Sequence, residues 1–90
     1  MSTTLDGVIQ DRISFLQEQL GAEDDPAYIR TFRTQIKILQ NTQLDRLEEL
    51  ITIRRNDLQA CKNAIETENV FAELDALEWL QRQAQRLADA

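Results

Sequence analysis

The chain has 90 residues, 42% of them apolar, with one cysteine, no histidine and a formal net charge of −6 at pH 7. These values predict a single small cytoplasmic domain over residues 1–90. They exclude a disulfide framework, a zinc site and the Cys/His or Ser/His pairs of nucleophilic catalysis. Because the apolar runs are short and the start lacks a basic and apolar leader, we expect neither membrane insertion nor secretion.

Motifs of known chemistry are also missing from the sequence. The only glycines are Gly7 and Gly21, so there is no glycine-rich loop to hold a phosphate. Acidic pairs such as Glu48 and Glu49 lack the ligand spacing of a calcium loop. We therefore expect a protein that is not an enzyme and has no catalytic residue, cofactor or bound metal.

The first predicted element is an amphipathic helix over residues 5–20. Thr3 followed by Asp6 resembles a capping box, and Gly21 is suited to the left-handed residue that ends a helix. Phe15 lies at the edge of the apolar face and is expected in the core. The face itself consists of Leu5, Val8, Ile9, Ile13, Leu16 and Leu20. After a short acidic turn over residues 21–25, this helix should lie antiparallel to the next one.

A long helix is predicted over residues 26–65. Asp25 is a good N-cap and Pro26 fits the first helical position. We favour an unbroken rod because residues 40–43 contain neither Gly nor Pro. The alternative is a break at 40–43 in which Thr42 caps a second helix, with Asp45 completing a capping box. The apolar spacing is carried by Ile29, Phe32, Ile36, Leu39, Leu44, Leu47, Ile51, Leu58, Cys61 and Ile65.

A last helix is predicted over residues 69–88, after a second chain reversal within the polar stretch 66–69. Thr67 or Asn69 is the expected cap. The apolar face consists of Val70, Leu74, Leu77, Leu80, Ala84 and Leu87. The predicted fold is all-α, a helix-turn-long helix-turn-helix chain that forms a coiled-coil-like bundle completed by homodimerisation. The alternative is a compact monomeric four-helix bundle with a break at 40–43.

Charge is unevenly distributed along the chain. Residues 1–29 carry a net charge of −5, residues 30–63 of +3, and residues 64–90 of −4. Arg30, Arg33 and Lys37 share one helical face in the basic middle segment. An acidic protein with three clustered cations lacks the footprint of nucleic-acid binding, so we expect no nucleic-acid partner.

Two residues on the apolar stripe of the long segment need an interpretation of their own, because one is charged and the other is a thiol. Arg54 lies between Ile51 and Leu58, where a polar residue either sets register or extends its charged head to Asp57, Glu49 or an acidic partner helix. We favour the second interpretation. Cys61 recurs in register with the apolar residues, so we expect a small buried side chain without a redox role.

Several large side chains lie off the predicted apolar faces and are the candidates for contact with a partner. Trp79 is predicted to point away from the buried face of the last helix. There it would pack on a neighbouring arginine stem, be covered by a second subunit, or anchor a partner. Ile38 lies on a second face of the long helix. The full candidate set is Trp79, Phe71, Arg82 and Arg86, with Ile38 and Tyr28 as second choices.

The function that these features predict is the binding of another protein by a small helical adaptor, chaperone or regulatory protein. The alternative is an acidic inhibitor or decoy that blocks a basic, nucleic-acid-binding surface of a target protein. A decoy complex should weaken steeply with salt, whereas an apolar contact should not. The carboxylates of the decoy surface would be Glu23, Asp24, Asp25, Glu66, Glu68, Glu73 and Asp75.

Overall fold

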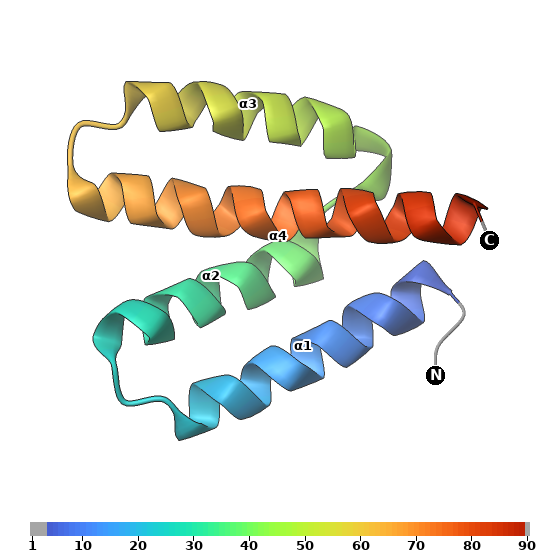
Figure 1. The fold of residues 1–90 in the computed structure, drawn as a ribbon, viewed down its shortest axis with the longest axis horizontal. Coiled ribbons are helices and arrows are strands. Elements are labelled where there is room, and N and C mark those ends of the chain that lie inside the picture. The colour runs from blue at the N-terminus through green and yellow to red at the C-terminus, as the bar shows by residue number, and fades with distance from the viewer. Residues whose placement is uncertain (1–3, 90) are drawn as a thin grey trace.

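Residues 4–89 are described by a computed structural model, and they form four α-helices and one short 3₁₀ helix without any strand (Figure 1). The predicted all-α fold is therefore confirmed. The elements are α1 (Leu5–Ala22), α2 (Pro26–Asn41), the 3₁₀ helix η1 (Leu44–Arg46), α3 (Leu47–Ala60) and α4 (Ala64–Asp89).

The two ends of α1 differ from the prediction. Thr4 is the N-cap, and its Oγ1 accepts a hydrogen bond of 3.1 Å from the Gly7 amide. The predicted capping residue Thr3 lies outside the described residues. Gly21 is part of the helix, and the described glycines have no positive φ, so the predicted left-handed end is wrong. The helix ends instead at the extended Glu23, whose amide donates to the carbonyl oxygen of Leu20.

The favoured rod over residues 26–65 is wrong, because the chain breaks after Asn41 as in the alternative prediction. Thr42 and Gln43 both have extended backbone angles, which any residue adopts, so the break requires neither Gly nor Pro. Asn41 Nδ2 donates to the Lys37 carbonyl at 2.8 Å, and Thr42 Oγ1 donates to the Ile38 carbonyl at 2.5 Å. The Ile38 carbonyl also accepts from the Thr42 backbone amide at 3.0 Å, so the side-chain bonds add to the last backbone bond of α2.

Thr42 is therefore the C-cap of α2. The alternative prediction, in which Thr42 caps the next helix, is wrong on this point. The residue before η1 is Gln43, and neither η1 nor α3 has a side-chain N-cap among the described hydrogen bonds. The start of α2 agrees with the sequence prediction. Asp25 Oδ1 accepts from the Ala27 amide at 2.9 Å, and Pro26 occupies the first turn.

The last helix begins at Ala64, five residues before the predicted start, so Thr67 and Asn69 are not its caps. Asn63 Oδ1 accepts from the Glu66 amide at 2.9 Å, and Glu66 Oε2 accepts from the Lys62 amide at 3.0 Å. Asn63 thus caps the first turn of the helix, whereas the Glu66 carboxylate binds the amide before Asn63, so the reciprocal bond of a true capping box is replaced by one to Lys62. The second chain reversal therefore lies at 61–63. With 26 residues, α4 is the longest element at about 39 Å.

The helices are arranged around α4, which contacts each of the other three (Figure 1). α2 and α3 pack on different sides of α4, and within residues 4–89 they make no close contact with each other. α1 lies antiparallel to α2, as predicted, and also contacts α4. The bundle is flat, with extents of 40 × 32 × 18 Å. Its radius of gyration of 13.6 Å exceeds the value of about 12 Å for a compact chain of this length.

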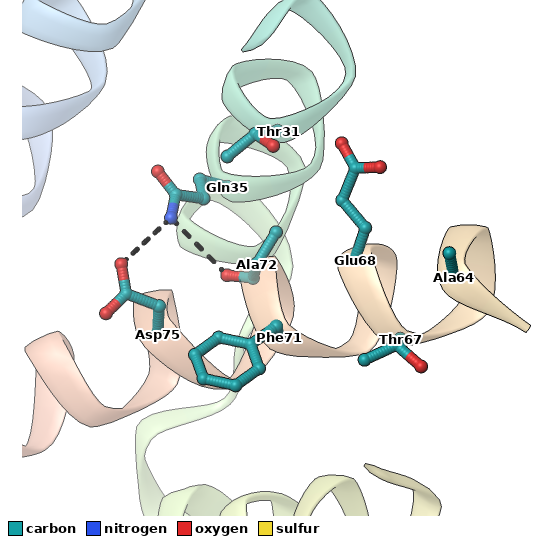
Figure 2. A pocket seen from close by; sticks show the side chains of 8 residues that line it. All are labelled: Thr31, Gln35, Ala64, Thr67, Glu68, Phe71, Ala72 and Asp75. Carbon is teal, nitrogen blue, oxygen red and sulfur yellow. Dashed lines mark hydrogen bonds between the residues drawn. The ribbon is translucent and has the colours of Figure 1, made fainter. Parts of the chain in front are cut away.

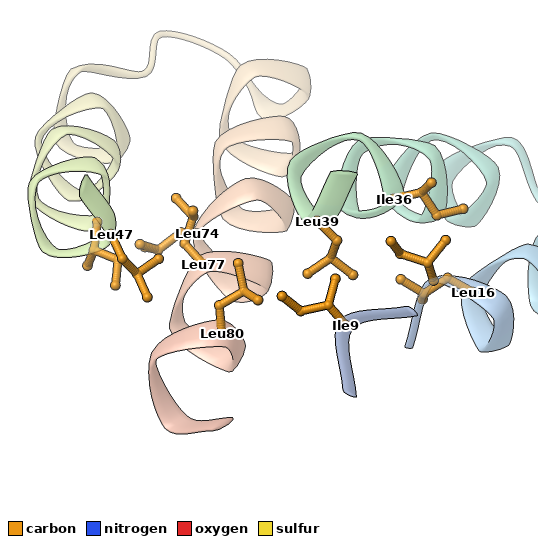
Figure 3. Packing of buried hydrophobic residues seen from close by; sticks show 10 residues of the cluster. Ile9, Leu16, Ile36, Leu39, Leu47, Leu74, Leu77 and Leu80 are labelled. Atoms are coloured by element: carbon orange, nitrogen blue, oxygen red, sulfur yellow. The ribbon is translucent and has the colours of Figure 1, made fainter. Parts of the chain in front are cut away.

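The core is a continuous apolar cluster that all four α-helices share. Figure 3 shows the labelled leucines of α4 between Leu47 of α3 and Leu39 of α2. Leu80 has an exposed fraction of 0% and is the most completely buried side chain of the cluster. The cluster consists of Ile9, Ile13, Leu16, Ile36, Leu39, Leu47, Ile51, Leu74, Leu77 and Leu80. Each spacing follows the helical period, which explains why the sequence locates most of this core.

Several residues of the predicted apolar faces are not buried. Leu44 and Ile65 belong to the apolar spacing predicted for residues 26–65, but they are 40% and 61% exposed because the breaks after Asn41 and Ala60 take them off the face of one continuous helix. Phe15 is 46% exposed, and the guanidinium carbon of Arg12 lies 5.1 Å from the centre of its ring. Cys61 is a free, half-buried thiol at the end of α3, where its Sγ donates to the Asp57 carbonyl at 3.2 Å. Between Thr4 and Asp89, no helix combines the length and the apolar content needed to cross a lipid bilayer.

Candidate functional site

Two openings in the surface flank the packing of α2 against α4. The first, here called the α2–α4 cleft, has a volume of about 660 Å³ (Figure 2). Its lining consists of Thr31, Gln35, Ala64, Thr67, Glu68, Phe71, Ala72 and Asp75. The second, here called the basic groove, lies between α2 and α3 and has a volume of about 600 Å³. The ion pair between Arg30 and Glu68 connects them, since Arg30 lines the groove and Glu68 lines the cleft.

Gln35 fixes the geometry of the α2–α4 cleft. It is the buried polar residue of the described chain, and its amide would be costly to bury without hydrogen bonds. Its Nε2 donates to Asp75 Oδ2 at 3.1 Å and to the Ala72 carbonyl at 3.5 Å, as Figure 2 shows. These bonds join α2 to α4 at the base of the cleft.

Phe71 gives the α2–α4 cleft its apolar wall. The side chain is 59% exposed although it is a large aromatic group, and Figure 2 shows its ring lying toward Asp75. Ala64 and Ala72 also line the cleft, and their small side chains occupy little of its space. The cleft thus combines an exposed aromatic surface with polar groups held at its base, and this arrangement suits the insertion of an apolar side chain.

The basic groove collects four cations from two helices. Arg30, Arg33 and Lys37 belong to α2, and Arg54 belongs to α3. Arg30 pairs with Glu68 at 3.4 Å. Within the described chain, Arg33 and Lys37 have no carboxylate within ion-pair distance. The sequence predicted the shared face of the three α2 cations, but it did not place Arg54 beside them.

Arg54 connects α3 to the acidic side of α4. Its Nη1 lies 2.8 Å from Asp57 Oδ2 and its Nε lies 2.7 Å from Glu73 Oε2. The favoured interpretation, in which the head reaches Asp57 or an acidic partner helix, is confirmed. Glu73 Oε2 is buried and has no hydrogen-bond donor in residues 4–89, so the contact with Arg54 is a charge contact without hydrogen-bond geometry. Arg54 is therefore the group that compensates this carboxylate.

A separate, exposed ion pair lies at the start of α3. Arg46 Nε donates to Glu49 Oε2 at 3.2 Å. This hydrogen bond, together with the attraction between the charges, lowers the pKa of Glu49 and raises the pKa of Arg46. Neither residue lines the cleft or the groove.

The sequence predicted that Trp79 points away from the buried face of its helix, and this prediction is wrong. It is half-buried and packs against the core, and the guanidinium carbon of Arg12 lies 5.6 Å from the centre of its ring. One of the predicted interpretations placed Trp79 on a neighbouring arginine, and this arginine is Arg12 of α1. Arg82 lies beside both residues, around a small cavity of about 80 Å³. Trp79 therefore helps to hold α1 on α4.

The structure does not bring the other candidate residues into one surface. Phe71 lines the α2–α4 cleft, whereas Ile38 is half-buried in the basic groove. Tyr28 is exposed and stacks on Phe32 with ring centres 6.2 Å apart. Arg86 is exposed near the end of α4. The sequence analysis did not identify Gln35 as a site residue. Its position next to Ile36, on the edge of the apolar face of α2, is a signal that could have indicated a buried polar group.

Within residues 4–89, no three His, Cys, Asp or Glu side chains come together as metal ligands would. No family model, curated protein or solved structure matches this chain in comparisons with known proteins.

Proposed function

We propose that this protein is a non-enzymatic interaction module that holds an apolar side chain of another protein in the α2–α4 cleft. One observation carries the proposal: Phe71 is 59% exposed on the wall of an open cleft of about 660 Å³. Leaving a large aromatic side chain in water forgoes burial free energy, so exposed aromatic groups beside a concave surface are typical of binding sites. The base joined by Gln35 favours binding because a preformed site requires little ordering on contact.

This activity would suit an adaptor, a chaperone or a regulatory protein. Its proposed location is the cytoplasm, in keeping with a single free thiol. The predicted homodimer stays a prediction. Its premise was an unbroken rod with an open core, and the break after Asn41 lets α3 cover α4 within one chain.

No specific observation favours the decoy hypothesis over this one. Most of its carboxylates already serve contacts inside the chain: Glu68 and Glu73 pair with arginines, and Asp75 accepts from Gln35. Asp25 caps α2 and Glu66 caps the start of α4. A decoy surface needs carboxylates that are free to meet a basic target.

Affinity capture from native extract tests the proposed function. The wild-type chain is compared with Phe71→Ala and with a matched control, Phe15→Ala, which removes an exposed aromatic side chain from α1. We expect a bound protein that Phe15→Ala retains and Phe71→Ala loses, while circular dichroism shows unchanged helix content in both variants. A bound protein that Phe71→Ala retains in full would contradict the role of the cleft.

A further inference from the structure

We infer that the basic groove is a second contact surface, which docks an acidic amphipathic helix of a partner protein. This surface is separate from the α2–α4 cleft, and neither binding event requires the other. α2 and α3 form its walls and α4 forms its floor, where Asn69 and Glu73 lie. Because α2 and α3 do not contact each other across residues 4–89, the groove is open above α4.

The first support is a pair of cations that have no ion-pair partner among residues 4–89. Arg33 and Lys37 are four residues apart on α2, where like charges repel each other. Acidic residues outnumber basic ones by 16 to 10 in the chain, yet no carboxylate of the described residues pairs with either cation. This arrangement is unfavourable for the isolated helix, and an external anion would relieve it.

The second support is the way in which the other two cations are held. Arg54 is fixed by Asp57 and Glu73, and Arg30 is held by Glu68. A guanidinium has five N–H donors in a planar fork, so these contacts leave donors available on both side chains. The groove therefore presents two oriented guanidinium groups together with two cations that no carboxylate of residues 4–89 pairs with.

The third support identifies the kind of anion. Ile38 and Leu50 are half-buried among the cations, so the groove offers an apolar contact as well as positive charge. Arg33 and Lys37 are separated by about 6 Å along the axis of α2. Two glutamates one helical turn apart have the same separation, and a leucine between them would meet the apolar residues.

A nucleic acid fits these observations less well than an acidic helix. The chain has a net charge of −6, which repels a long polyanion. The carboxylate of Glu73 also lies in the groove itself, close to Arg54. A short segment that contributes two carboxylates and one apolar side chain matches both the number of unpaired cations and the apolar residues beside them.

The test uses the full chain and a synthetic helical peptide of about 14 residues, with glutamates four apart flanking a leucine stripe. Binding is measured by calorimetry, and the bound region is located from backbone amide shifts in NMR spectra. Arg33→Glu/Lys37→Glu is compared with Lys62→Glu/Arg86→Glu, which reverses two exposed cations elsewhere. Each change replaces two positive charges by two negative ones, so both variants have the same net charge.

We expect the groove variant to weaken peptide binding by at least about tenfold and the control variant to bind nearly as the wild type does. Amide shifts should cluster on α2 and α3, and a peptide with glutamine in place of glutamate should bind weakly. Arg33→Gln/Lys37→Gln should give a smaller loss in the same direction. Phe71→Ala should bind the peptide normally, which separates this inference from the proposed function.

Three results would overturn the inference. The first is an absence of binding by the acidic peptide, and the second is an equal loss of binding in the two charge-reversal variants. The third is a single-stranded DNA oligonucleotide that binds more tightly than the peptide with the same dependence on Arg33 and Lys37, since that result would assign the groove to nucleic acid.

Discussion

Replacing Leu80 by alanine is the sharpest test of the packing around α4. Leu80 has an exposed fraction of 0% and lies where the helices converge on α4. The substitution removes roughly three carbon groups, each worth about 0.8 kcal/mol of transfer free energy. The cavity left behind adds to this, because the surrounding helices relax only in part. We expect Leu80→Ala to lower the free energy of unfolding by about 3 to 4 kcal/mol.

A loss of this size is large for a chain of 90 residues, whose total stability is expected to be about 5 to 13 kcal/mol. Urea unfolding followed by far-UV circular dichroism measures it, and the thermal midpoint should fall by more than about 10 °C. The matched control is Ile65→Ala, which truncates a side chain that is 61% exposed and should change stability by less than about 0.5 kcal/mol. Equal effects of Leu80→Ala and Ile65→Ala would refute the assigned core.

Three further predictions follow from individual contacts. Arg54→Ala should lower stability by about 1 to 2 kcal/mol in urea unfolding, because it leaves the buried Glu73 oxygen uncompensated, and Arg54→Ala combined with Glu73→Gln should recover part of the loss. In a carboxyl NMR titration, Glu49 should have a pKa below the ordinary 4.5. The ion pair with Arg46 should therefore stabilise the folded state above pH 4.5, and this stabilisation should be lost as the pH falls through the lowered pKa. Arg46→Gln should return the pKa of Glu49 to its ordinary value. Trp79 fluorescence in the isolated chain should be blue-shifted and protected from a soluble quencher, whereas emission like that of free tryptophan would contradict its packing against the core.

The sequence predicts the interior of the helices better than their ends. The helical spacing of Ile9, Ile13 and Leu16 is sufficient to locate the buried face of α1, since only one side of that helix meets the bundle. The start of α2 was predictable because Asp25 and Pro26 are both strong N-terminal signals.

The break after Asn41 was harder to predict because no residue there is a helix breaker by type. At the end of α2, the side chains of Asn41 and Thr42 donate to carbonyls of the last turn, which is a local alternative to further helix that Asn and Thr offer. The break also depends on the packing of Leu47 and Ile51 into the core shared with α4, which requires α3 to turn back. Tertiary packing of this kind overrides local helix preference.

The error at Trp79 has a geometric cause. The prediction gave the last helix a single apolar face, whereas α4 is contacted by three helices and its buried surface extends further around its axis. Ala72 and Ala76 are buried on the additional side, although neither belonged to the predicted face. Trp79 lies on the same side and meets Arg12 of α1. The number of neighbours around a helix is a property of the whole fold, so the spacing within one helix does not reveal it.

The attachment of α3 has a consequence for how the bundle opens. Among the described α-helices, α3 packs on α4 alone, whereas α1, α2 and α4 all contact one another. Detaching α3 exposes Leu47 and Ile51 but leaves the contacts of the other three helices in place. Such an opening requires less free energy than global unfolding, so the amide protons of α3 should exchange with deuterium well before those in the middle of α4. We therefore expect the bundle to open in two steps, in which the wall of the basic groove formed by α3 detaches first.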